Sequence, residues 1–290
     1  MGHRTLKCAL TIGTQSAQSI RASGTSAAST GRTRDRTRPM LQQRQKVLAK
    51  APSTRDPKRT LPTGTQPIRI NATKGGIMQF DIDKMAALDR FELLLGTVVP
   101  RPIALVTTLG EDGTLNSAPY SQFTVLSHDP PLLLISALSH PDRRLKDTAK
   151  NILATKEFTV SMVSEAIAEA MNVTCIDAPP GTNELKLAGL ETAASTKIKT
   201  PRVAASPVAF ECRFLTSLSF GSNQAIFIGQ IVYGYVADQF VINAERGLID
   251  TPKLKLIGGM HGQKWYTRLS DCFAMDRSTW AEWVRQNKTA

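Results

Sequence analysis

The chain has 290 residues, of which 41% are hydrophobic, and it carries 36 lysines and arginines against 24 aspartates and glutamates, a formal net charge of +12. The apolar content excludes a wholly disordered chain, because such chains contain too few hydrophobic residues to form a core. The mean hydropathy is -0.16, and no apolar run approaches the roughly 20 residues of a transmembrane helix. These values exclude an integral membrane protein.

The excess positive charge is confined to the first quarter of the chain. Residues 1–76 contain 15 of the 36 bases but only two acids, Asp35 and Asp56, which leaves 21 bases and 22 acids for residues 77–290. The first quarter is also rich in Ser, Thr, Gly and Gln and lacks apolar periodicity. We therefore expect residues 1–77 to be a disordered basic extension and residues 78–290 to be one near-neutral globular domain.

Three interpretations of the extension stay open. Its Arg-rich, Ser-rich and acid-poor composition is typical of an organelle transit peptide, and a basic arm also attracts nucleic acid or an anionic membrane. It can equally be an upstream segment without function, because Met78 begins what looks like a natural start. No aromatic residue occurs between Met1 and Ile77, which disfavours single-strand binding by stacking. For the domain itself we expect neither nucleic acid nor membrane as a partner.

The four cysteines are scattered and include no CxxC pair: Cys8, Cys175, Cys212 and Cys272. With no secretory signal, this argues against a disulfide scaffold and against a zinc site. A reducing, intracellular location is the better expectation. It would be the cytoplasm, or the mitochondrion if the extension is a transit peptide.

From residue 80 the sequence is typical of a folded domain. A helix is predicted at Leu88–Leu95, ended by Gly96, and a strand at Ile103–Thr108. Asp112-Gly113 is a strong hairpin signal, after which a polar strand is predicted from Thr114 to Ser127. The continuous apolar run Leu132–Ser136 predicts a strand that is buried on both faces.

The second half of the domain adds further strands and fewer helices. Residues 177–205 are predicted to be rich in loops, and a docked C-terminal helix is predicted around Trp280, Trp283 and Val284. The other predicted elements are a helix at Arg144–Lys156, a strand at Phe158–Val163, a helix capped by Ser164, and strands at Val208–Phe214 and Ala225–Val236. Strands joined by short turns favour an antiparallel barrel or sandwich over alternating βαβ units.

Several well-known catalytic and nucleotide-binding motifs are absent from the sequence. There is no G-x-G-x-x-G after a strand and no G-x-x-x-x-G-K-[ST], which argues against a Rossmann dinucleotide site and a P-loop. The G-x-S-x-G elbow of α/β-hydrolases is also missing. The four histidines have no metal-ligand spacing, and no pair of acids is marked out as acid and base. Hydrolysis and phosphoryl transfer are therefore disfavoured, and we expect no metal.

Two segments together suit a planar ligand that carries a phosphate. Asn116–Phe123 offers small residues for close backbone approach, two serine hydroxyls, and Phe123 as an apolar wall for a flat ring. Ser136 and the helix start at Arg143–Thr148 offer hydroxyls, cations and outward N–H groups for an anion. Each segment also has a plainer interpretation: an ordinary polar strand and turn, and a solvated basic helix start capped by Asp147.

At this point the sequence resembles the flavin reductase-like family of FMN-binding split barrels, which includes the flavoredoxins. The resemblance spans about residues 80–277 with its motifs in order. It is carried by Pro100-Arg101-Pro102-Ile103-Ala104, Asn116–Phe123, Asp129-Pro130-Pro131, Lys146-Asp147-Thr148 with Asn151-Ile152, Glu184–Leu190, Pro201-Arg202-Val203-Ala204, Phe210-Glu211-Cys212 and Gly258–Tyr266.

The resemblance implies a mainly β fold, a six-stranded antiparallel Greek-key split barrel with a few flanking helices, which forms a homodimer and binds FMN. In such proteins the segment matching Asn116–Phe123 lines the isoalloxazine ring, and those matching Ser136 and Arg144–Thr148 hold the phosphate. The cofactor-binding residues that it implies here are Arg101, Asn116, Ser117, Ala118, Pro119, Tyr120, Ser121, Phe123, Ser136, Arg144, Lys146, Asp147 and Thr148.

The function that we expect from the resemblance is an FMN-dependent oxidoreductase. NADH or NADPH would give a hydride to the flavin, which would pass electrons to an acceptor that the sequence does not identify. We assign no catalytic side chain. The family often has Arg two places before its Gly-Gly pair, where this chain has Leu256 beside Lys255, which puts donor preference in doubt. The alternatives are a non-catalytic flavin-binding electron carrier and, more remotely, a nucleic-acid-binding protein that uses the basic arm.

Overall fold

The computed structural model describes residues 76–290, apart from 141, 143, 222 and 288–290. The predicted disordered extension, residues 1–77, thus lies outside the described residues except for its last two. Within the described part, no helix is long and apolar enough to cross a membrane.

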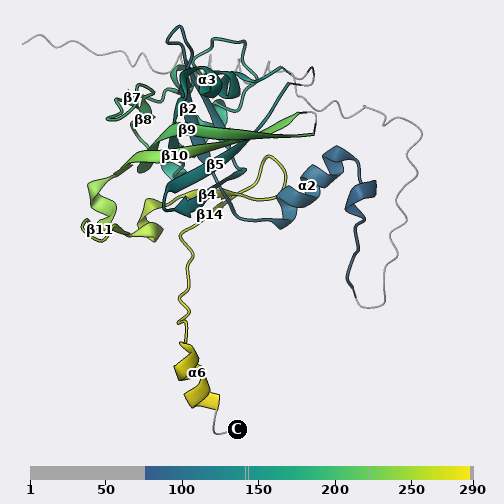
Figure 1. Ribbon diagram of the computed structural model, residues 1–290, viewed down its shortest axis with the longest axis vertical. Coiled ribbons are helices and arrows are strands. Elements are labelled where there is room, and N and C mark those ends of the chain that lie inside the picture. The colour runs from purple at the N-terminus through teal and green to yellow at the C-terminus, as the bar shows by residue number, and fades with distance from the viewer. Residues whose placement is uncertain (1–75, 141, 143, 222, 288–290) are drawn as a thin grey trace, which may run out of the picture. The chain divides into compact units, whose positions relative to one another are not determined.

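A seven-stranded sheet forms the centre of this part of the chain (Figure 1). Its strands follow the order β3-β2-β6-β9-β10-β5-β4, and every neighbouring pair is antiparallel. In that order the strands are Leu115–Tyr120, Ala104–Leu109, Glu157–Met162, Val208–Phe220, Gln224–Val236, Pro131–Leu138 and Phe123–His128. The predicted mainly β, antiparallel architecture is confirmed.

Two hairpins fix much of the register. β2 and β3 are joined by residues 110–114, where Gly113 has a φ of 81° and the N–H of Gly110 donates to the carbonyl of Thr114 over 2.8 Å. β9 and β10 are joined at Gly221, which has a φ of 59°. Glycine adopts these left-handed conformations at no steric cost, so both turns confirm the hairpins that the sequence predicts.

The segment predicted as a single strand, Thr114–Ser127, is divided in two. β3 ends at Tyr120 and β4 begins at Phe123, yet these strands lie at opposite ends of the sheet order. Only Ser121 and Gln122 separate them, so the two edges of the sheet must come together at this corner. The N–H of Ser136 on β5 donates to the carbonyl of Gln122 over 2.9 Å. The break closes the sheet towards a barrel and gives it one strand more than the expected six.

β2 and β6 have consecutive buried residues and are buried on both faces, whereas β5 is not. Ala104 and Val106 of β2 belong to one apolar cluster, and Leu105 belongs to a second cluster on the other face. β5 alternates instead, with Leu133 and Ile135 fully buried and Leu132 and Leu134 only partly buried. The apolar run Leu132–Ser136 was therefore predicted wrongly as buried on both faces, because a run without alternation does not reveal a half-exposed side.

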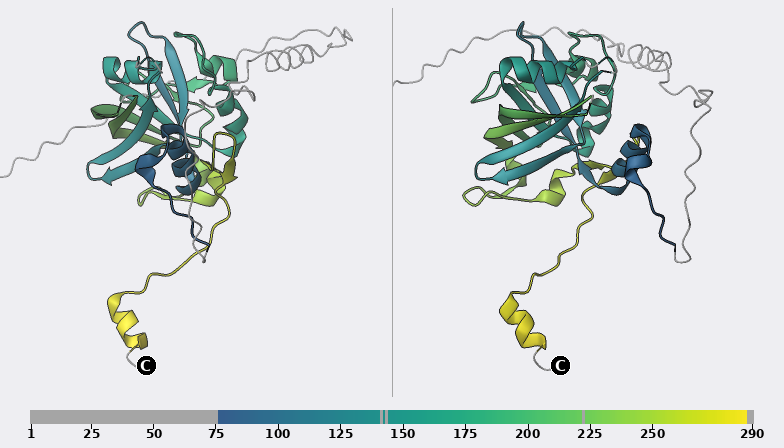
Figure 2. Two further views of the ribbon diagram at one scale, coloured as in Figure 1. Left: turned by 90° about the vertical axis from the view of Figure 1, so that its right-hand side faces the viewer. Right: turned by 45° about the vertical axis from the view of Figure 1, so that its right-hand side comes forward.

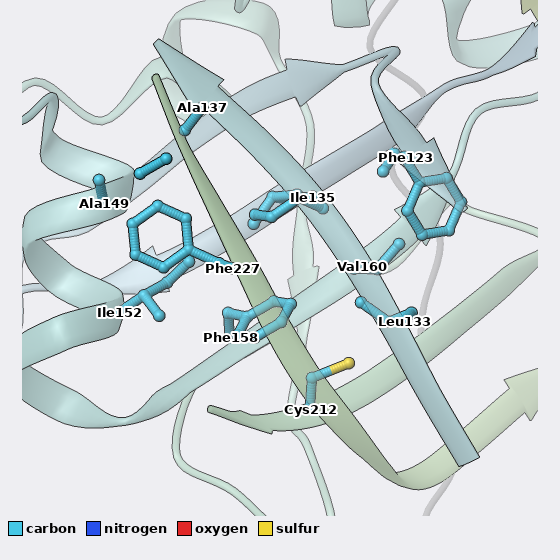
Figure 3. Close-up of a cluster of buried hydrophobic side chains, with 13 residues drawn as sticks. Phe123, Leu133, Ile135, Ala137, Ala149, Ile152, Phe158, Val160, Cys212 and Phe227 are labelled. Atoms are coloured by element: carbon cyan, nitrogen blue, oxygen red, sulfur yellow. The ribbon is translucent and has the colours of Figure 1, made fainter. Parts of the chain in front are cut away.

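The first apolar cluster fills the inside of the sheet, against one helix (Figure 3). Phe158 and Phe227 lie at its centre, and Ala149 and Ile152 reach it from helix α3 (Asp147–Thr155). Packing is tight enough that a Cβ on Gly229 would lie 2.5 Å from the Cζ atom of Phe158. The inside of the sheet is therefore a filled core, not a ligand cavity.

The second apolar cluster lies on the opposite face of β2. It is covered by helix α4 (Ala168–Val173) through Met171 and by helix α5 (Glu184–Ala188) through Leu185. α5 falls in the segment predicted to be rich in loops. Asn183 caps it by accepting from the N–H of Lys186 over 3.0 Å, and Gly189 ends it with a φ of 68°. The sequence contains residues typical of the start and end of a helix, Asn183 and Gly189. The five residues between them are too few to show helical periodicity of apolar side chains.

The remaining elements are short. Helix α2 (Ala87–Thr97) confirms the first predicted helix. The others are the sheet of β1 (Arg101–Pro102), β13 (Ile257–Gly259) and β14 (Tyr266–Arg268), the pairs β7 (Thr192–Ala193) with β8 (Arg202–Val203) and β11 (Val241–Asn243) with β12 (Leu248–Ile249), and 3-10 turns at Ile82–Lys84, Glu165–Ile167, Asp238–Phe240 and Thr251–Leu254.

The C-terminal helix α6 (Trp280–Asn287) is present, but it is not docked as predicted. None of its residues is buried, and the rings of Trp280 and Trp283 stack on each other with centroids 5.2 Å apart. Helical spacing of apolar residues predicts the helix correctly, but it does not identify a surface for them to pack against.

A buried carboxylate holds the loop between β7 and β8 against the sheet. Glu211 on β9 has no exposed surface, and it accepts hydrogen bonds from the N–H groups of Thr196, Lys197 and Ile198 and from the hydroxyl of Tyr235. Burial alone would raise the pKa of Glu211, but these donors outweigh it and leave the pKa below its usual value. The ionised form is therefore the one that the fold stabilises.

We expect Glu211→Gln to lower the free energy of unfolding at pH 7 by about 2–3 kcal/mol, because charge-assisted hydrogen bonds to buried donors are lost. Since the folded pKa is depressed, the contribution of Glu211 is present above its usual pKa of 4.5 and is lost as the pH falls through the folded value. The melting temperatures of the two proteins should thus converge in acid. Glu157→Gln, which removes a carboxylate with one backbone donor, Lys199, is the matched control, and a constant difference across pH would contradict the assignment.

Candidate functional site

A cavity of about 540 Å³ lies along β3. Its walls come from β3, the end of β5, the start of α3, the segment before α5, and the β13–β14 sheet with α2. None of the buried residues of the first apolar cluster lines this cavity. The ribbon views show the arrangement of α2, α3, β5 and β14, which contribute to its walls (Figures 1 and 2).

The long wall of the cavity is the free edge of β3. This strand pairs with β2 on one side only. The N–H of Ser117 points away from β2, because it donates to Oε2 of Glu184 over 2.9 Å. Alternate residues of a strand direct their backbone polar groups to the same side, so the backbone of Pro119 also faces outwards, without an N–H. The edge therefore presents carbonyl groups and little donor capacity towards the cavity.

One end of the cavity is polar and is built on the start of α3. Lys146 is the N-cap residue, and Asp147 and Thr148 follow in the first turn. The Nδ2 atom of Asn116 on β3 donates to the hydroxyl of Thr148 over 2.9 Å and is 3.2 Å from that of Thr108. These buried hydrogen bonds join strand to helix, so the cation, the helix start and the strand edge keep a fixed relation.

Most N–H groups of the Arg101 guanidinium are bonded to groups of the protein. It donates to the carbonyls of Leu95, Val98 and Met260, and its Nε is 3.4 Å from the hydroxyl of Ser121. Burial lowers its pKa, which the nearby Tyr266 partly offsets, but an arginine stays charged at physiological pH. Arg101 thus clamps the end of α2 to the loop after β13, and few of its donors are left for a ligand.

The other end of the cavity is aromatic. Phe91 of α2 and Trp265 and Tyr266 at β14 line it, and the indole of Trp265 stacks on His261 with ring centroids 5.5 Å apart. Gly259 contributes backbone alone, and a Cβ there would lie 3.1 Å from Nη2 of Arg101. A flat group can therefore approach this end closely between aromatic side chains.

The structure brings together eleven of the thirteen residues predicted to bind a cofactor. Those that line the cavity are Arg101, Asn116, Ser117, Ala118, Pro119, Tyr120, Ser121, Ser136, Lys146, Asp147 and Thr148. Phe123 is not among the lining residues, because its side chain belongs to the core. Arg144 is not among them either: its Nε bonds to Oδ2 of Asp142 over 2.6 Å.

The prediction did not include Glu184, Tyr266 or Trp265, which also line the cavity. Glu184 opens α5, the helix that the sequence did not reveal. The departure at Leu256 has no consequence for the walls, since neither Leu256 nor Lys255 is a lining residue. Barrel and cavity together define a β-barrel protein whose cavity lies along an edge strand, outside the hydrophobic core.

Comparison with known proteins identifies the family. Residues 95–248 match the flavin reductase like domain. An uncharacterized protein of Deinococcus radiodurans is 39% identical over 211 residues, which cover 71% of this chain and 92% of that protein. The chain therefore belongs to the flavin reductase-like family, and the split barrel expected from the sequence is confirmed.

Two solved structures are similar over nearly their whole length. The 2-nitrobenzoate 2-nitroreductase of Pseudomonas fluorescens is 31% identical, with a TM-score of 0.64, and the match covers 70% of this chain and 97% of that one. The nitrilotriacetate monooxygenase component B of Bacillus cereus is 30% identical, with a TM-score of 0.65, and covers 69% of this chain and 99% of its own.

We expect Arg101→Lys to lower the free energy of unfolding by about 2 kcal/mol or more, because an ammonium group cannot replace a planar fork that bonds several carbonyls. Amide hydrogen exchange should rise at residues 94–98 and 259–261, the two segments that the guanidinium joins. Arg144→Lys, at an exposed residue paired with Asp142, is the control and should change neither quantity. Unchanged exchange in Arg101→Lys would show that the segments are held by other contacts.

Proposed function

We propose that this protein is an FMN-dependent oxidoreductase that takes a hydride from NADH or NADPH. The observation that carries the proposal is the single cavity that joins a carbonyl-rich strand edge, a cationic helix start and an aromatic end, in a chain of the flavin reductase-like family. The relatives named above as a nitroreductase and as a monooxygenase component support redox chemistry.

The cavity residues fit such a cofactor. The hydroxyl of Ser117 is buried and has no hydrogen-bond partner among the described residues, although Ser117 lines the cavity. A buried polar group without a partner is costly unless a ligand or water satisfies it. Residues 116–121 would lie along the flavin ring, and Ser136, Lys146 and Thr148 would hold the phosphate at the start of α3.

A bound flavin would supply the redox chemistry between a reduced nicotinamide and an acceptor. The protein's own task is to bind and orient. Arg101 fixes the loop after β13, and the aromatic end formed by Phe91, Trp265 and Tyr266 offers a flat donor or acceptor a place beside the ring. We assign no catalytic side chain, because the cofactor itself would carry the redox chemistry.

We expect the protein to bind added FMN with quenching of flavin fluorescence, and to oxidise NADH or NADPH when FMN is in excess. Lys146→Ala should weaken FMN binding roughly 3- to 10-fold, since one phosphate contact from a half-exposed lysine is lost. Arg144→Ala, which removes a cation outside the cavity lining, should leave the affinity unchanged.

Three outcomes separate the possibilities in this experiment. A protein that ignores added FMN contradicts the proposal. A protein that binds FMN but does not oxidise either nicotinamide is an electron carrier. Equal effects of the two substitutions would mean that Lys146 acts through general charge and not through a phosphate contact. Oxidation measured with 2-nitrobenzoate present or absent then tests one class of acceptor.

We further propose that the protein acts as a homodimer. Leu218 pairs with Ile226, which pairs with Ser136, and Phe220, Gln224 and Leu138 form the next row. Residues opposite each other across strands share a face. Leu218, Phe220 and Leu138 are 47%, 54% and 40% exposed, and the rows run directly into cavity residues Ser136 and Leu138. An apolar face of this kind suits contact with a second copy.

Light scattering should give a mass near twice 31.6 kDa. We expect the combined substitutions Leu218→Glu and Phe220→Glu to shift the protein towards the monomer, because they place charges in the proposed contact. Ile242→Glu, at an exposed apolar residue of β11, is the control and should leave the mass unchanged. A monomeric unaltered protein would contradict the proposal.

A further inference from the structure

The buried acid Glu184 lines the cavity, and one of its two carboxyl oxygens makes no hydrogen bond to another described residue. Glu184 is 8% exposed and lines the cavity at the start of α5. Its Oε2 atom accepts from the N–H of Ser117 over 2.9 Å, which is its one hydrogen bond to another of the described residues. The N–H of Glu184 itself also lowers the pKa of this carboxyl, but Oε1 has no partner in another described residue and can still accept a hydrogen bond.

No cation within the described part of the chain neutralises this carboxyl. Lys146, the cation at this end of the cavity, lies with its Nζ 4.0 Å from Oδ1 of Asp177. Burial raises the pKa of Glu184, and the charge of Asp147 raises it further, while the N–H of Ser117 acts in the opposite direction. A buried acid without a cation costs stability, so its presence here calls for a compensating role.

The hydroxyl of Ser117 shares this position and also lacks a partner. Ser117 is 1% exposed, its Oγ makes no hydrogen bond, and its backbone N–H is the group that Glu184 accepts from. Capping the edge of β3 accounts for Oε2 of Glu184. It does not account for Oε1 or for the Ser117 hydroxyl, which together offer an acceptor and a donor to whatever occupies the cavity.

Ser117 and Glu184 lie at the end of strand segment 116–121 that meets the segment assigned to the phosphate. Ser117 belongs to the strand edge, and its neighbour Asn116 bonds to Thr148 at the start of α3. Asp147 of the same helix start is near enough to Glu184 to affect its pKa. In FMN a chain of hydroxyl-bearing carbons joins the ring to the phosphate, and hydroxyl groups are natural partners for a carboxylate and a serine.

We propose that Glu184 and Ser117 bind the hydroxyl groups of the ribityl chain, which makes them determinants for flavins that carry this chain. The inference rests on the proposed FMN binding. It predicts that the two side chains contribute to affinity for riboflavin and FMN equally, whether or not a phosphate is present. It also predicts that they contribute nothing to affinity for lumiflavin, which has the ring but no ribityl chain.

The test is titration of the full chain with lumiflavin, riboflavin and FMN, followed by flavin fluorescence. Glu184→Ala should raise the dissociation constants of riboflavin and FMN about tenfold or more, as for the loss of a hydrogen bond to a charged group, and change that of lumiflavin less than twofold. Ser117→Ala should act in the same direction by a few fold, with an unchanged melting temperature because its hydroxyl has no protein partner to lose. Lys186→Ala on the exposed face of α5 is the matched control and should not alter any of the three.

Equal weakening of lumiflavin and FMN by Glu184→Ala would show that Glu184 only shapes the strand edge, and would overturn the inference. Unchanged affinity for riboflavin and FMN in both variants would overturn it as well. Failure of the unaltered protein to bind any of the three flavins would instead overturn the proposed function, and the inference with it.

Discussion

The free edge of β3 is the constraint on which the site depends. An edge strand exposes backbone donors and acceptors that must be satisfied or protected. In this chain Pro119 has no N–H on the outward side, and Glu184 accepts from the outward N–H of Ser117. A further strand would therefore find few free donors to pair with. The carbonyl groups stay available to the cavity. Because its outward N–H groups are missing or capped, the edge of β3 offers mainly carbonyl acceptors. Such an edge suits a flat ligand that brings its own hydrogen-bond donors.

Packing on both faces of β2 holds the edge of its neighbour β3 in place. Side chains of β2 enter both apolar clusters, so the strand cannot shift without disturbing either. β3 is paired to β2 along its whole length, and Asn116 ties it to α3. The cavity wall is therefore fixed by packing that lies behind it. A site supported in this way holds its geometry before the ligand arrives.

Charge was the most conspicuous property of the sequence, but few cations take part in the site. Arg101 is consumed by backbone carbonyls and Arg144 by Asp142, which leaves Lys146 as the cavity cation with donors to spare. A sequence motif shows that an arginine occupies a position, but it does not show whether that arginine binds the ligand or stabilises the fold. Arg101 stabilises the fold, since its planar guanidinium donates to three carbonyl groups from two segments of the chain.

The hairpins and long strands were predictable because their signals are local. Asp112-Gly113 and Gly221 fix turns, and alternation in β9 marks a half-buried strand. The break at Ser121-Gln122 has no such signal, since it arises when a curved sheet meets its own edge. α5 was hidden by its length and α6 was predicted to dock on spacing alone. Most of the predicted site residues line the cavity. Glu184 was not predicted, because its place in the site depends on a hydrogen bond to Ser117, 67 residues away in the chain.

The placement of the tryptophans has a practical consequence for spectroscopy. The chain contains three; Trp265 lies at the aromatic end of the cavity, and the other two stack on α6, so none of them reports on the filled core. Intrinsic fluorescence will therefore follow events at the cavity and at the C-terminal helix, and the melting of the barrel has to be read from the backbone by circular dichroism. The indole at the cavity is, in turn, a built-in donor for energy transfer to any chromophore that binds there.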